Sequence, residues 1–86
     1  MWVKLKHQPI KKGDLLIHEI DKEDLYNKDI LSSFFVKEIE GENYQLENFI
    51  IQPDFNLDAT PNIAIPIDFT ISYKELVKAN WHLWID

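Results

Sequence analysis

Apolar and polar residues alternate with a period of two in several parts of the chain, which is the pattern of half-buried β-strands. The alternation predicts strands over residues 2–6, 15–20, 33–40, 44–51, 62–71 and 81–85. In the segment 62–71, every second residue from Ile63 to Ile71 is a large apolar one, which predicts a single buried face. Pro66 removes a donor from that ladder, so we expect this strand at a sheet edge or at a bulge.

Turn and cap signals separate these strands. The run KKGD at 11–14 precedes the second strand, and EGEN at 40–43 places glycine and asparagine as a tight hairpin requires. Ser72 and Glu75 have the spacing of a capping box and predict a short helix over 73–79.

The polar segment 21–33 has no strand alternation. It predicts a long loop held against the core by its embedded apolar residues, with a short helical turn as the alternative. The embedded residues are Leu25, Tyr26, Ile30 and Leu31.

Together these elements predict a mainly β fold over residues 1–86, in one domain. We expect a small barrel or a strongly bent antiparallel sheet of five to six strands, with one short helical turn near the C-terminus. The element order carried by KKGDLLIHEI, FFVKEIEGENYQLENF and IPIDF resembles that of small SH3-like barrels, including those of KOW-like type, over roughly residues 11–85. The resemblance implies binding through loops and one aromatic face, and such folds serve many functions.

The net charge and its distribution along the chain limit the classes of binding partner. The net charge is −6 and the chain has no arginine, which argues against direct nucleic-acid binding. Nucleic-acid-binding barrels of this kind usually have basic loops, and the loops here are acidic. Residues 1–12 carry four lysines and no acid, whereas 13–68 carry thirteen acids and three lysines. The acidic middle predicts either a solvated face or a surface for a basic partner.

The chain has no cysteine, so packing must stabilise the fold without disulfides. The N-terminal residues contain no run of seven apolar side chains, and no segment approaches the length of a membrane span. We therefore expect a cytoplasmic protein that does not enter membranes.

No catalytic or metal-binding pattern is complete. Asp54, Asn56 and Asp58 have the spacing that opens a calcium loop, but Ala59 stands where that loop needs glycine and Ile65 where it needs glutamate. The histidines have no metal-ligand spacing, and we expect His18 to be partly buried with a hydrogen-bond partner. No serine lies in a nucleophile motif, and two glycines cannot form a phosphate-cradling loop. We predict no cofactor, no metal and no enzymatic activity.

Aromatic residues indicate a function more clearly than the catalytic and metal-binding patterns do. Trp81 and Trp84 lie on opposite faces of a strand, so both cannot enter one small core, and we expect some of the aromatic residues to be exposed. The alternative is that Trp84 covers the end of a barrel.

The leading hypothesis is a non-enzymatic binding protein that occupies a partner surface, as inhibitors, immunity proteins and phage-encoded antagonists do. Its predicted contacts are aromatic anchors and the carboxylates of the hairpin, which would steer a basic partner. These residues are Trp84, Trp81, Phe55, Tyr26, Glu38, Glu40, Glu42 and Glu47.

Two alternatives remain. One is an oligomer that sequesters a nucleotide or another small molecule, with aromatic stacking and a basic N-terminal segment that meets phosphate; its lysines are Lys4, Lys6, Lys11 and Lys12. The other is a nucleic-acid mimic, for which the alternating Glu38, Glu40 and Glu42 are the signal.

Overall fold

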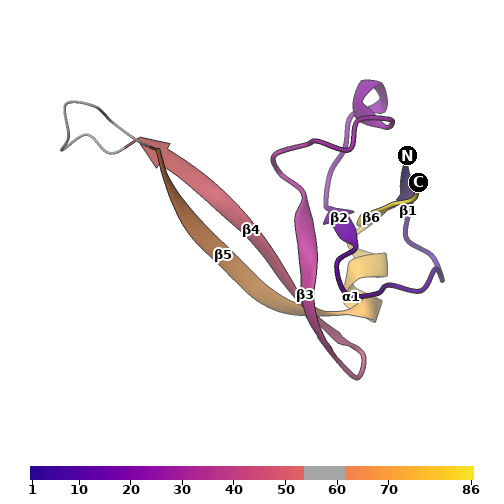
Figure 1. Ribbon diagram of the computed structural model, residues 1–86. Helices are drawn as coiled ribbons and strands as arrows, with labels where there is room; N and C mark the ends of the chain where they lie inside the picture. Colours follow the sequence, from indigo (N-terminus) through magenta and orange to yellow (C-terminus); the bar gives the residue numbers. More distant parts are fainter. Residues whose placement is uncertain (54–61) are drawn as a thin grey trace.

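The computed structural model describes the backbone of residues 1–53 and 62–86, and the side chains of residues 1–48 and 67–86. Its described strands form one antiparallel sheet in the order β1-β6-β2-β3-β4-β5, which curls into a half-barrel (Figure 1). The strands are β1 (Trp2–Lys4), β2 (Leu15–Ile17), β3 (Phe34–Glu40), β4 (Asn43–Pro53), β5 (Asn62–Ser72) and β6 (His82–Trp84). A helix, α1 (Tyr73–Lys78), joins β5 to β6, and a 3-10 helix, η1 (Lys22–Asp24), lies between β2 and β3. The mainly β fold with a strongly bent sheet and a late helical turn is confirmed.

Three strands are shorter than the alternation predicted. The predicted strands 2–6, 15–20 and 81–85 are each three residues long in the structure. After β1 the backbone bends away from the ladder, and the side chain of Gln8 accepts hydrogen bonds from the backbone N–H groups of Lys6 (2.7 Å) and His7 (3.1 Å). Local side-chain hydrogen bonds of this kind satisfy backbone groups outside the sheet, so the apolar pattern extends further than the pairing.

Both predicted turns form. Gly41 and Glu42 connect the paired residues Glu40 and Asn43, and Gly41 has φ 61°, which a type II′ turn requires at its first central residue. In the KKGD turn, Gly13 has φ 91°, and the carboxylate of Asp14 accepts a hydrogen bond of 2.8 Å from the N–H of Lys11.

Strands β4 and β5 make the longest ladder, and β5 is the edge of the sheet, which confirms the edge position predicted from Pro66. The β-bulge lies elsewhere, in β3 between Val36 and Glu38. Pairing of β3 with β4 stops at Phe35 and Glu47, so β4 and β5 continue beyond it as a two-stranded arm that projects from the rest of the sheet (Figure 1).

Helix α1 begins where the sequence predicted and ends one residue earlier than predicted, at Lys78. The Ser72 hydroxyl accepts a hydrogen bond from the N–H of Glu75 at 3.2 Å. At the other end Asn80 has φ 61°, and the N–H of Trp81 donates to the carbonyl of Leu76 at 3.0 Å. With the bond from Asn80 N–H to the Val77 carbonyl, this is a Schellman motif, and it directs Trp81 back onto the core.

The core lies along the concave side of the sheet. Its principal cluster joins side chains from β2, β3, β4, α1, β6 and the segments next to them: Leu5, Ile10, Leu16, Val36, Tyr44, Leu46, Leu76, Trp81 and Leu83. Trp2 is also buried, at 1% exposure, because the long loop covers it. The indole N–H of Trp2 donates to the carbonyl of Asn27 at 2.7 Å, and its backbone N–H donates to the carbonyl of Leu25 at 2.8 Å.

The long loop is therefore held to the core, as predicted, and it includes the helical turn η1. The expectation that all four of its apolar residues hold it is wrong: Tyr26 is 78% and Leu31 is 88% exposed. Hydrogen bonds from Trp2 take this role instead. Among the described residues, no helix has both the length and the apolar character to cross a membrane.

Candidate functional site

An open groove of about 570 Å³, here called the carboxylate groove, lies between the end of β2, the long loop and the start of β3. Its lining residues are Ile17, His18, Glu19, Ile20, Asp21, Asp24, Ile30, Ser32 and Phe34. They come from a single stretch of chain, residues 17–34. The helical turn η1 reverses this stretch, and the N–H of Asp24 donates to the carbonyl of Asp21 at 2.9 Å. The size lies within the range of ordinary ligand sites, about 300–1,000 Å³.

An aromatic stack supports one wall of this groove. The imidazole of His18 lies over the indole of Trp81, with ring centroids 5.1 Å apart and an angle of 23° between the rings. Phe34 meets the same indole edge-on at 5.8 Å. The expectation that His18 is partly buried is wrong, because β2 ends at Ile17 and His18 leaves the ladder to an exposed position over Trp81. Trp81 itself, a predicted contact residue, is only 6% exposed.

Acidic side chains make the carboxylate groove negatively charged. Glu19, Asp21 and Asp24 line it, and no lysine occurs among the described residues of its lining. Ile20 and Ile30 are half-buried there, so carboxylates stand beside apolar surface. This combination suits a cationic side chain, whose apolar stem packs while its charged end meets the acids.

A second groove of about 760 Å³ lies against α1 and is here called the lysine groove. Its lining residues are Lys6, Gly41, Glu42, Tyr44, Tyr73, Lys74, Val77 and Lys78. They come from three separate segments: the bend after β1, the β3–β4 hairpin, and α1.

Tyr73 joins these three segments. Its backbone N–H donates to the carbonyl of Glu42 at 3.0 Å, and its hydroxyl donates to the carbonyl of Gln8 at 2.6 Å. The N–H of Leu5 also donates to the carbonyl of Trp81 at 2.9 Å. Burial, with a smaller effect from Tyr44, raises the pKa of the Tyr73 phenol. The phenol thus stays protonated and keeps its hydrogen bond to Gln8.

Three exposed lysines line the lysine groove. Lys74 and Lys78 lie four residues apart, on one face of α1, and Lys6 comes from the bend after β1. Glu42 is the single carboxylate among the described residues of this lining. Within the part of the chain that the structure describes, no ion pair involves any of these three lysines.

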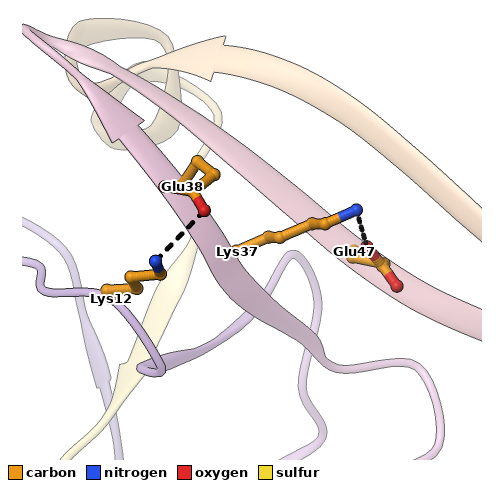
Figure 2. Close-up of polar contacts among 4 residues, drawn as sticks. All are labelled: Lys12, Lys37, Glu38 and Glu47. Atoms are coloured by element: carbon orange, nitrogen blue, oxygen red, sulfur yellow. Dashed lines mark ion pairs between the residues drawn. The ribbon is translucent and has the colours of Figure 1, made fainter.

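The predicted hairpin carboxylates do not form one surface. Glu38 and Glu40 line a small pocket of about 150 Å³ on the convex face of the sheet, whereas Glu42 lines the lysine groove. Two of them are ion-paired (Figure 2): Glu38 with Lys12 at 3.1 Å, and Glu47 with Lys37 at 3.0 Å.

The two ion pairs differ in their surroundings. Glu47 is buried, at 7% exposure, whereas Lys12 and Glu38 both stand in solvent. A hydrogen bond to Glu47, and then its negative charge, raise the pKa of Lys37. The buried Glu47 carboxylate is thus paired with Lys37.

The predicted basic segment is also divided. Lys6 alone of its four lysines lines the lysine groove, and Lys12 pairs with Glu38 across the KKGD turn. Lys4 lies near His82 on β6, where burial first and Lys4 second lower the pKa of the imidazole. Lys11 stands in the KKGD turn.

The predicted aromatic anchors also occupy different places. Trp84 is half-buried against Trp2, with ring centroids 5.4 Å apart, and its indole N–H donates to the carboxylate of Asp86 at 2.7 Å. Tyr26 is exposed on the long loop. Phe55 lies outside the described residues, as do Asp54, Asn56 and Asp58.

Sequence reasoning missed both grooves, although each leaves a signal in the sequence. The acids of the carboxylate groove cluster within residues 19–24, and the spacing of Lys74 and Lys78 places them on one face of the predicted helix. The sequence gives no comparable signal for Lys6. Its segment lies far from α1 in the sequence and is brought there by the hydrogen bonds of Tyr73 and Leu5.

In the described part of the chain, no cluster of three or more histidine and acidic side chains is arranged to hold a metal ion. Comparison of the chain with protein-family models, with curated proteins and with solved structures finds no match.

Proposed function

We propose that this chain is a non-enzymatic binding protein that occupies a basic surface of a protein partner with its carboxylate groove. One observation carries the proposal: the groove combines an apolar floor with Glu19, Asp21 and Asp24, and the described lining has no lysine to neutralise them. Such a surface attracts cationic residues at long range and packs their stems at short range.

Exposed apolar residues on the same loop extend the contact. Tyr26 and Leu31 are largely exposed, and both lie on the loop that forms the outer wall of the groove. Large side chains of this kind contribute much of the energy of protein interfaces when a partner covers them, tyrosine above all. A partner that reached both the groove and this loop would gain charge complementarity and buried apolar area together.

The contact surface differs from the one that the sequence suggested. Lys12 and Lys37 already neutralise Glu38 and Glu47, so the convex face of the hairpin offers less uncompensated charge than the groove does. Trp84 packs against Trp2, and we assign it to the support of the terminal strands. The mode of action stays that of small inhibitors and antagonists, which work by covering a partner's surface.

A photoreactive amino acid at Ser32, which lines the groove, tests the proposal in extracts of the cells that make the protein. The matched position is Thr70, which is exposed on the convex face. We expect the probe at Ser32 to crosslink one defined protein, and the probe at Thr70 to crosslink it much less.

Charge variants show whether the carboxylates carry this contact. We expect Asp21→Asn with Asp24→Asn to abolish the crosslink, and Glu40→Gln with Asp68→Asn, which changes the net charge equally, to preserve it. Asp21, the N-cap residue of η1, makes no side-chain cap hydrogen bond, so its change to asparagine leaves the helix cap intact. A crosslink that survives the groove variant, or none from Ser32, would refute the proposal.

A further inference from the structure

The lysine groove concentrates positive charge on a strongly acidic protein. Of nine lysines in the chain, three line this one groove, against one carboxylate. Two of them, Lys74 and Lys78, lie at i and i+4 on α1, where like charges destabilise a helix. Since no ion pair within the described residues offsets these charges, the groove carries a net attraction for anions.

The framework of the groove is rigid. Tyr73 bonds to the hairpin through its N–H and to the segment before Ile10 through its hydroxyl, so all three walls are fixed relative to its ring. The Schellman motif at Asn80 fixes the end of α1 that carries Lys78. Binding therefore requires little ordering beyond that of the lysine side chains, which lowers its entropic cost.

The walls also offer apolar and aromatic surface. Tyr73 and Val77 are half-buried, and Tyr44 lies behind Tyr73 with ring centroids 6.1 Å apart. A ligand that carried only negative charge would leave this surface in water. A planar ring beside an anionic group would use both parts of the groove.

The geometry points to the lysine groove as a binding site for a nucleoside phosphate, with its phosphates held by Lys6, Lys74 and Lys78 and its base against Tyr73 and Val77. Lysine is a point-charge donor suited to phosphate. The volume of about 760 Å³ fits a mononucleotide, and the net charge of −6 disfavours a nucleic-acid strand that would pass the acidic hairpin. The site is independent of the partner contact proposed above, because the two grooves have no lining residue in common.

Titration of the full chain with ADP, followed by backbone amide NMR, tests this site. We expect shifts of Lys6, Tyr73, Val77 and Lys78, and weaker binding of adenosine and of inorganic phosphate than of ADP. If phosphate alone binds as tightly as ADP, or adenosine does, then the groove does not recognise a nucleoside phosphate. A glutamate-rich peptide that binds the groove more tightly than ADP would also overturn the assignment and indicate an acidic protein.

A matched pair of variants excludes a general charge effect. Lys74→Gln with Lys78→Gln removes two charges from the groove, and Lys22→Gln with Lys28→Gln removes two exposed charges elsewhere. We expect the first pair to weaken ADP binding about 10-fold or more, since charge-assisted hydrogen bonds are lost, and the second to change it less than about 2-fold. Equal losses in both pairs, or amide shifts outside the groove, would contradict the site.

Discussion

The carboxylate groove and the lysine groove have opposite charge and opposite origins. Residues 17–34 supply the whole lining of the first, so its acidity is already present in one stretch of sequence. The second brings together residues 6, 41–44 and 73–78, which lie far apart in the chain. A groove formed within one loop has local determinants, whereas a groove formed between segments depends on the tertiary contacts that join them.

Trp81 connects the two regions. Its ring stacks against His18 beside the carboxylate groove, while its backbone bonds to Leu5 and Leu76 hold the frame of the lysine groove. A change at Trp81 should therefore affect both grooves, and changes at the other positions below should separate them.

The largest effect is expected for Trp81→Ala. Truncation of this buried ring leaves a cavity in the principal core cluster, and we expect a loss of about 3–5 kcal/mol in the free energy of unfolding. Urea denaturation measures it. His18→Ala is the control: it removes the exposed stacked ring and should cost less than about 1 kcal/mol. A Trp81→Ala protein as stable as the control would show that this ring does not support the core.

Asn80→Ala should have the next largest effect on stability, and it should affect the lysine groove. A residue with φ 61° is left-handed, and alanine there costs about 1–2 kcal/mol, whereas Asn80→Gly should cost nothing. Thermal unfolding of both variants separates backbone strain from loss of the amide. Equal destabilisation by alanine and glycine would mean that the asparagine side chain matters and the backbone conformation does not.

Tyr73→Phe removes the hydroxyl that donates to Gln8 and leaves the ring in place. We expect a loss of about 0.5–1.5 kcal/mol, with amide shift changes around Lys6 and Gln8. The carboxylate groove should keep its amide shifts, because no residue of its lining contacts this bond. Changes at Glu19 or Ser32 would show that the grooves are coupled.

The smallest effect is a pH dependence from His82 on β6, which lines neither groove. Burial lowers its pKa from 6.5, so the unfolded chain takes up a proton before the folded one does. The stabilising contribution is complete above pH 6.5 and decreases as the pH falls through the lower folded pKa. We expect His82→Gln to reduce the loss of melting temperature between neutral and mildly acidic pH. An unchanged loss would show that His82 does not cause the effect.

Much of the fold could be predicted because its signals are local. The period-two alternation located all six strands, Pro66 indicated an edge, and the spacing of Ser72 and Glu75 located α1. Strand ends were less predictable. The N–H of Leu5 still bonds in register to the carbonyl of Trp81, whereas the N–H groups of Lys6 and His7 bond to the side chain of Gln8.

The candidate sites could be predicted only in part. An acidic surface follows from composition, but the exposure of Tyr26 and the pairing of Glu38 and Glu47 with lysines from the KKGD turn and from β3 do not. A long side chain on a neighbouring strand decides whether a carboxylate is free, and that neighbour is known only when the register is known. The β3 bulge between Val36 and Glu38 changes this register.

One titration tests the central claim that the two grooves act separately on opposite charges. Amide NMR of the full chain is recorded with ADP and, separately, with a peptide of alternating lysine and leucine. We predict that ADP shifts Lys6, Tyr73, Val77 and Lys78, that the peptide shifts Glu19, Asp24, Ile30 and Ser32, and that neither probe shifts the other set. If both probes shift the same residues, or neither shifts either set, the account of two independent grooves is wrong.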